Sequence, residues 1–175
     1  MINMIRLAIA KGVRFDYVLV DSWFTCFKLV KFIVARRIKC HFIGMIKMGK
    51  TRYNAFDKNL IAKEIVDLLR REKRIRRSKL LGYYYVETMV AFKGIQVKLF
   101  FCKSSKKGNC NGMMTTNSEL TFEQAYKIYS TRWSVEVFFK ESKQNLGLGK
   151  CQAQDFDAQI AATTLCMLQY NLLRL

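Results

Sequence analysis

The stretch FDYVLVDSWF at residues 15–24 decides the expected fold class. Its first six residues form a short, mostly apolar run, which predicts a buried strand that ends at Asp21. From Ser22 onward, apolar residues recur at spacings of three and four, which predicts a helix. Residues 41–47 (HFIGMIK) predict a second strand, and residues 2–11 predict a helix that precedes the first strand. The order helix–strand–helix–strand favours an α/β fold in which a crossover joins neighbouring strands.

The middle of the chain, residues 48–118, has a different pattern. Apolar residues between positions 60 and 69 predict an amphipathic helix. Residues 83–92 and 95–102 predict two strands of a hairpin, joined at a Lys-Gly turn. Residues 113–117 predict one more short strand. We therefore expect an antiparallel block inserted into the α/β part.

A long helix is expected from Thr121 to about Asn145, because Thr121-x-x-Gln124 is a capping-box pattern and glycines follow. A last helix is expected from about Asp157 to the end. At 100° per residue, six side chains of the long helix share one face about 100° wide. These are Tyr129, Arg132, Trp133, Glu136, Lys140 and Lys143.

Beside this face, a stripe that includes Val135 and Phe139 is expected to contact the core. The face itself has two interpretations. One is an ordinary exposed salt-bridge face, with Glu136 paired to Lys140 at i, i+4 or to Arg132 from the other side. The other is a functional carboxylate surrounded by cations. Periodicity alone does not choose between them.

Asp21 also has two interpretations. An Asp between a strand and a helix is a good helix N-cap, a role that Ser22 can share. A carboxylate at the carboxyl end of a buried strand is also where α/β proteins place functional groups. The residues around it leave both open.

The charge points to a polyanionic partner. Lys and Arg total 31 against 13 Asp and Glu, for a net charge of +18. Such an excess is typical of nucleic-acid binding and less often of a membrane surface. Much of it lies in one basic run, which is otherwise explained as a solvated helix end and loop. The run consists of Arg70, Arg71, Lys73, Arg74, Arg76, Arg77 and Lys79.

The cysteines and the apolar segments argue against several classes of protein. The six cysteines have no C-x-x-C spacing and the only histidine is His41, so a four-ligand zinc site is not expected. Free thiols suit a reducing compartment. No apolar run approaches the ~18 residues that a membrane span needs. We expect a cytoplasmic protein with no membrane partner.

The helix face carries a resemblance to a known family. Tyr129, Arg132, Glu136 and Lys143 form the pattern Y-(2)-R-(3)-E-(6)-K. This pattern, within YSTRWSVEVFFKESKQNLGLGKCQ, resembles the signature of DDE transposases of the insertion-sequence-four type. The segment YVLVDSWF is similar to that family's segment around its second catalytic Asp. The resemblance extends from about residue 13 to residue 175.

The resemblance implies a ribonuclease H-like core, a mixed sheet flanked by helices, interrupted by a β-rich insertion. Residues 1–47 and 113–175 would form the core, and residues 48–112 the insertion. The expected fold class is therefore α/β with an incomplete ribonuclease H-like core that lacks its first strands. Only 20 residues precede Asp21, and Asp16 among them lies too close along the strand to replace an Asp on a neighbouring strand.

The resemblance also implies roles for the site residues. The family holds two Mg²⁺ ions with two Asp and one Glu, and here Asp21 matches the second Asp and Glu136 the Glu. Tyr129, Arg132 and Lys143 match residues that hold phosphates near the cleaved transposon end, with Lys140 and Trp133 as further DNA contacts on the same face. For Trp133 and for Trp23, core packing is the alternative to stacking on a base.

The expected function is Mg²⁺-dependent strand cleavage and transfer at insertion-sequence ends, with transposon-end DNA as the partner. Because two ligands of three hold metal poorly, we expect no cleavage from this polypeptide alone. The alternative is a non-catalytic DNA-binding remnant, or an inhibitor that pairs with a full-length transposase; a homodimer is a further expected form.

Overall fold

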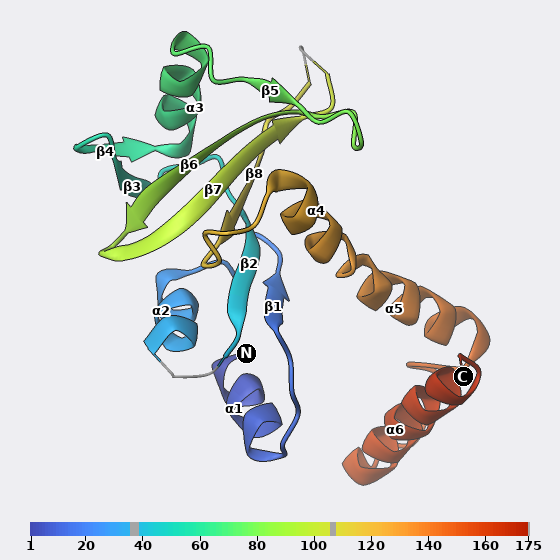
Figure 1. Ribbon diagram of the computed structural model, residues 1–175. Helices are drawn as coiled ribbons and strands as arrows, with labels where there is room; N and C mark the ends of the chain where they lie inside the picture. Colours follow the sequence, from blue (N-terminus) through green and yellow to red (C-terminus); the bar gives the residue numbers. More distant parts are fainter. Residues whose placement is uncertain (36–38, 106–107, 175) are drawn as a thin grey trace. The chain divides into compact units, whose positions relative to one another are not determined.

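The computed structural model describes residues 1–35, 39–105 and 108–174 (Figure 1). It is a mixed α/β structure with one sheet of mostly antiparallel strands. The chain divides into two compact units, Met1–Tyr129 and Ser130–Leu175. The first unit contains the sheet and the second contains the last two helices, so each is described by itself.

The sheet of the first unit has the order β1-β2-β8-β7-β6-β3-β4, and β5 pairs with β6. The strands are β1 (Tyr17–Val20), β2 (His41–Ile46), β3 (Arg52–Ala55), β4 (Lys58–Ile61), β5 (Arg76–Arg77), β6 (Tyr84–Phe92), β7 (Ile95–Lys103) and β8 (Asn111–Thr115). β1 and β2 are parallel, with Tyr17 opposite His41, and the other pairs are antiparallel. The predicted strand–crossover–strand unit is thus confirmed, as is the β6–β7 hairpin.

Both faces of the sheet are covered by helices. The helices of this part are α1 (Ile2–Ala10), α2 (Phe27–Ala35), α3 (Ala62–Arg71) and α4 (Phe122–Ser130). Because side chains alternate along a strand, Phe101 joins the core under α1, α2 and α3, whereas Phe100 joins the core under α4. Figure 1 shows α3 beside β3 and β4, and α2 beside β2.

The sheet is continuous across the segment that the sequence singled out as an insertion. β8 pairs with β2 on one side and with β7 on the other, so β6, β7, β3 and β4 belong to the same sheet as β1 and β2. The division into residues 1–47 and 113–175 as core and 48–112 as insertion stays a prediction.

Two predicted helix boundaries in this unit are wrong. The helix expected from Ser22 begins at Phe27, because a turn stabilised by Asp21 comes first. The helix expected from residue 60 begins at Ala62. Leu60 lies in β4 opposite Tyr53, and the Glu64 carboxylate accepts the backbone N–H of Ile61 at the helix start (2.8 Å).

The single helix expected over residues 121–145 is also wrong. α4 ends at Ser130 and α5 begins at Trp133 (Trp133–Asn145). The Ser134 hydroxyl donates to the carbonyl of Thr131 (2.7 Å), and the Ser134 N–H bonds the same carbonyl with i→i+3 spacing. Such local hydroxyl bonding competes with the regular helical pattern.

The second unit is a pair of helices, α5 and α6 (Phe156–Leu172). Phe138 meets Tyr170 edge to face at 4.8 Å, and Arg174 pairs with Glu141 at 3.0 Å. Phe138, not the predicted stripe, therefore faces the neighbouring helix. Val135 and Phe139 are 50% and 46% exposed, so their predicted core packing is wrong. The helix expected from Asp157 to the end is confirmed as α6, although Leu175 lies outside the described residues.

Candidate active site

Asp21 directly follows β1 and is half-buried. Its Oδ1 accepts the backbone N–H groups of Trp23 (2.9 Å) and Phe24 (3.3 Å), and its backbone carbonyl accepts the Thr25 hydroxyl (3.0 Å). Oδ2 makes no hydrogen bond within the described part of the chain. Asp21 thus stabilises a turn ahead of α2, and its interpretation as the N-cap of the helix is wrong. One carboxylate oxygen stays available to a ligand.

A close backbone approach fixes this turn against the sheet. Gly44 in β2 lies opposite Val20 in the register. A methyl group at Gly44 would lie 2.5 Å from Thr25 Oγ1, 2.6 Å from Phe42 Cζ and 2.8 Å from Val20 Cγ2. Because Gly44 has no side chain, there is room for the Thr25 hydroxyl, which donates to the Asp21 carbonyl and so helps to orient Asp21.

Glu136 lies in the first turn of α5, and its Oε1 pairs with the guanidinium of Arg132. Of the two partners that periodicity allowed, the structure thus shows Arg132. Glu136 is 42% exposed and Arg132 28% exposed. Lys140 and Lys143 follow at i+4 and i+7 and are exposed. Neither lysine forms a salt bridge in the part of the chain that the structure describes.

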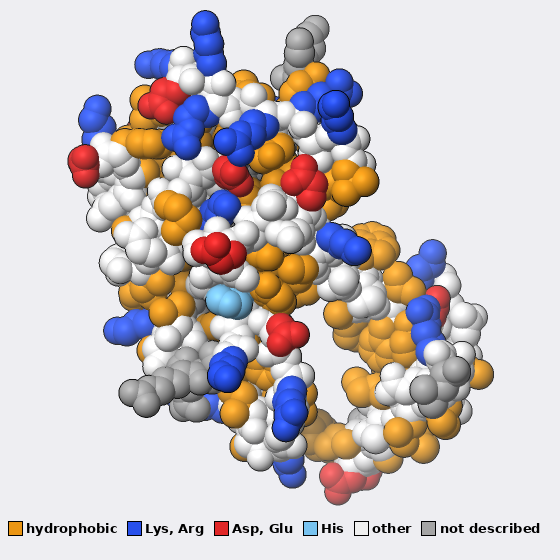
Figure 2. Space-filling model, in the orientation of Figure 1, with side chains coloured by type: hydrophobic (Ala, Val, Ile, Leu, Met, Phe, Trp, Pro, Cys, Tyr) orange, Lys and Arg blue, Asp and Glu red, His pale blue; other side chains and the backbone are white. Residues whose placement is uncertain are grey.

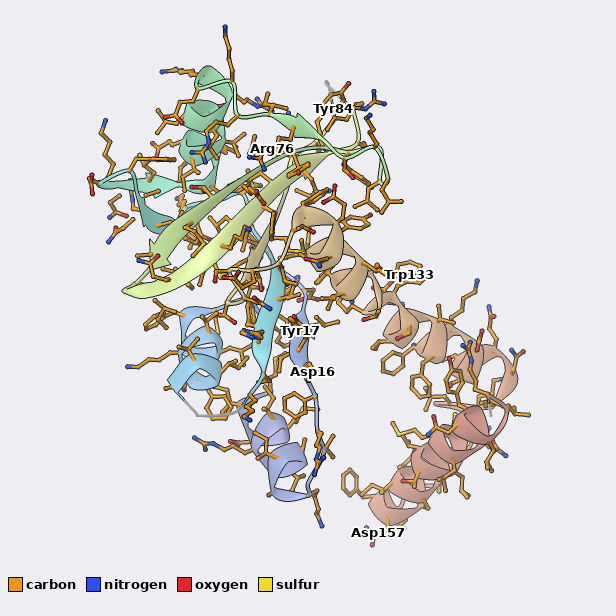
Figure 3. The ribbon with its side chains drawn as sticks, viewed as in Figure 1. Asp16, Tyr17, Arg76, Tyr84, Trp133 and Asp157 are labelled. Carbon is orange, nitrogen blue, oxygen red and sulfur yellow. The ribbon has the colours of Figure 1, made fainter. Side chains whose placement is uncertain are left out.

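The aromatic residues have different surroundings. Tyr129 belongs to the first unit and is partly buried against the core under α4. Trp133, at the start of α5 (Figure 3), is 63% exposed, and Trp23 is 79% exposed with Lys47 Nζ 4.0 Å from its ring centroid. The alternative of core packing is therefore wrong for both tryptophans.

The predicted site residues divide between the two units. Asp21 and Tyr129 are in the first, and Arg132, Trp133, Glu136, Lys140 and Lys143 are in the second. Within the second unit, Arg132 and Glu136 are in direct contact. Asp16 precedes β1 (Figure 3) and Asp21 follows it, so about 16 Å of extended backbone at ~3.3 Å per residue lies between their Cα atoms.

Carboxylate oxygens suit a hard cation such as Mg²⁺. Among the described residues, however, no cluster of three Asp, Glu, His or Cys side chains is placed to hold a metal ion. Asp21 and Glu136 fit as single ligands, since each keeps one oxygen outside the contacts described above.

A basic pocket beside the Asp21 turn was missed by sequence reasoning. It has a volume of about 600 Å³, and Ser22, Thr25 and Cys26 form one wall. Four cations from two separate segments line it, with no acidic residue: Lys47, Lys50, Arg52 and Lys93. The cluster K-M-G-K-T-R at residues 47–52 is the one local signal, and only the fold adds Lys93 to it.

The fold and the turn define an α/β protein with a half-buried carboxylate at the end of a parallel strand. The sequence matches the transposase DDE domain family over residues 1–172. The chain therefore belongs to the transposase DDE domain family. This membership implies DNA transposition, DNA as the partner and divalent metal ions as cofactors. No curated protein matches the sequence.

The helices give no indication of a membrane span. In the described ranges, none is both long and apolar enough to cross a bilayer.

Proposed function

We propose that this chain acts in DNA transposition of the insertion-sequence-four type, in which strands are cleaved and joined at the element's ends. The observation that carries the proposal is the Asp21 turn. In a chain that matches the DDE domain over residues 1–172, a half-buried Asp follows a parallel strand and keeps one oxygen free. The Y-R-E-K pattern around Glu136 supports the insertion-sequence-four type.

Asp21 and Glu136 would be the ligands that this chain supplies to two Mg²⁺ ions. Such a pair of ions supplies activation of the attacking oxygen and stabilisation of the leaving oxygen. Asp21 would offer Oδ2, since Oδ1 is used by the turn, and Glu136 would offer Oε2, since Oε1 pairs with Arg132. Lys143, Lys140 and Arg132 would hold DNA phosphates, for which cationic side chains are apt.

Cleavage by this polypeptide alone is not part of the proposal. The two carboxylates fall short of the family's three, and no third joins them in the described residues. We expect no nicking of transposon-end DNA with Mg²⁺ or Mn²⁺. Robust nicking that Glu136→Ala abolishes would contradict this expectation.

A test of the metal assignment has to work without turnover. Fe²⁺ can take the place of Mg²⁺, and with ascorbate and peroxide it produces radicals that cut the backbone close to the bound ion. We expect cuts near residues 21 and 136, both suppressed by excess Mg²⁺. The cut positions are read by mass spectrometry of the fragments.

The matched variants decide the outcome. Asp21→Asn or Glu136→Gln should remove both cuts, because both side chains are assigned to one centre. Asp16→Asn and Glu141→Gln remove the same charge nearby and should leave the cuts unchanged. Cutting at one position only, or cuts that survive Asp21→Asn, would rule out a shared metal centre.

Binding without cleavage is the second candidate function. The net charge of +18 supports DNA binding, with or without cleavage. In this case the chain would bind transposon-end DNA, form a homodimer or pair with a full-length transposase and inhibit it. DNA affinity that falls steeply with salt and does not respond to divalent ions would support this role.

A further inference from the structure

The basic pocket beside Asp21 has the chemistry of a phosphate site. Lys47 and Lys50 lie between β2 and β3, Arg52 is the first residue of β3, and Lys93 lies in the β6–β7 turn. Figure 1 shows that turn next to the start of α2, where Phe27 contacts Phe92 at 5.7 Å. The fold thus gathers positive charge from two segments, residues 47–52 and the β6–β7 turn, around one hollow.

Contacts within the protein hold three of these cations in place without neutralising them. Lys47 Nζ lies 4.0 Å from the Trp23 ring centroid, and Lys93 Nζ lies 5.3 Å from that of Phe27. Arg52 Nη1 donates to the carbonyl of Asn59 at 2.9 Å. Within the described residues none of the four pocket cations forms a salt bridge. Cations without a counter-ion raise the local concentration of an anionic ligand.

The basic run at residues 70–79 differs in this respect. Figure 2 shows Lys and Arg side chains gathered at the end of the first unit that carries α3 and β5. Several of them have an acidic partner: Arg70 pairs with Asp67, Arg74 with Glu72, and Arg76 with Glu87 at 3.0 Å. The basic run therefore has the highest density of positive charge along the sequence, but its charge is more neutralised in the folded protein than that of the pocket.

We propose that the pocket binds consecutive backbone phosphates of a DNA strand that passes the Asp21 carboxylate. The strand as ligand rests on the proposed function. Ser22 joins Asp21 directly to the pocket wall, and the hydroxyl of Thr25, another wall residue, bonds the Asp21 carbonyl at 3.0 Å. Phosphates held here would be the neighbours of the phosphate that Asp21 serves, so the pocket positions the strand and reads no sequence.

Two triple variants with equal loss of charge test the proposal. The pocket variant is Lys47→Gln, Lys50→Gln and Lys93→Asn; Asn is chosen because residue 93 has a positive φ of 50°. The comparison variant is Arg71→Gln, Lys73→Asn and Lys79→Gln in the basic run. Residue 73 also has a positive φ, of 55°, and none of these three residues forms a salt bridge in the described part of the chain. Unfolding curves confirm that both variants fold.

The affinity for a thymidine oligonucleotide is measured by fluorescence anisotropy over a range of salt, without divalent ions. Each phosphate contact to a single strand contributes about 0.7 to the salt slope, so the pocket variant should lose about 2 units of slope and about 100-fold in affinity at ~0.1 M salt. The comparison variant should lose much less. Equal losses in the two variants would overturn the proposal.

Two further results separate the alternatives. A wild-type chain that does not bind the oligonucleotide at all would refute the proposed function rather than the pocket. Inorganic triphosphate serves as the second probe. If it binds the wild-type chain more tightly than the oligonucleotide does, and the pocket variant loses that binding, the site holds a small polyphosphate and the strand proposal is overturned.

Discussion

Replacing Gly44 by alanine should loosen the turn that orients Asp21. The added methyl group would meet Thr25 Oγ1 at 2.5 Å and the buried side chains of Phe42 and Val20 at 2.6 and 2.8 Å. Phe42 and Val20 are packed within the core, so the substitution should push the Thr25 hydroxyl away from the Asp21 carbonyl. The turn at residues 21–25 would then be held less firmly against β2.

The magnitude follows from two opposing effects. Overpacking a filled core costs about 1–3 kcal/mol. Replacing a strand glycine by alanine recovers about 0.5–1 kcal/mol of backbone entropy. We expect a net loss of about 1–2 kcal/mol in the free energy of unfolding, which for a chain of this size lowers Tm by about 2–8 °C.

Urea and thermal unfolding followed by circular dichroism measure this loss. Gly49→Ala is the matched control, because nothing lies within 4 Å of a methyl group at the exposed Gly49. Thr25→Ala removes the nearest clashing atom, so Gly44→Ala should cost about 1 kcal/mol less in that background. If Gly44→Ala is as stable as Gly49→Ala, or if the Thr25→Ala background makes no difference, the close approach does not hold the turn.

Three further predictions concern stability. Lys98→Met should lower the free energy of unfolding in urea by about 2 kcal/mol, because Lys98 Nζ pairs with Glu87 at 3.5 Å and donates to two backbone carbonyls. The exposed Lys63→Met should cost nothing, and equal stability of the two variants would contradict the prediction. Asp155→Ala should cost about 1 kcal/mol, seen as lost helical signal on mild heating, because its carboxylate caps α6; an unchanged melting curve would show that the cap is dispensable. Burial raises the pKa of the Cys102 thiol from 9.0 to about 11. Because the unfolded chain then loses this proton at a lower pH than the folded chain, the free energy of unfolding should fall as the pH rises from ~9 to ~11. Cys102→Ala should reduce this fall, and an identical pH profile for the variant would refute it.

The sequence allowed good prediction of elements whose pattern is local. β1 and β2 were predictable because each is a short apolar run, and their parallel pairing follows from the crossover between them. The Asp21 turn was not predictable in detail. The Asp21 side chain also accepts the N–H groups of Trp23 and Phe24, and α2 begins only at Phe27. No glycine or proline at the break between α4 and α5 indicates it in the sequence. It follows from hydroxyl and carbonyl groups around Thr131.

The helical wheel overreached for the same reason. It assumed one regular helix and so placed Tyr129 on the same face as Glu136, although the helix that contains Tyr129 ends at Ser130. At the start of α5 the prediction of a carboxylate beside a cation is confirmed, because Arg132, the residue before the helix, pairs with Glu136. Angles at 100° per residue are reliable only inside an uninterrupted helix.

The distribution of charge is where sequence and structure differ most. A run of like charges along the chain suggests the place where a polyanion binds, but folding can bring acids from elsewhere to the run: Glu87 of β6 pairs with Arg76 of β5. Folding can equally collect sparse cations, and the β6–β7 turn carries Lys93 to a pocket otherwise built from residues 22–59. What attracts a phosphate is the positive charge that stays without a partner after folding. In this protein such charge lies beside Asp21, where the proposed function would place a DNA strand.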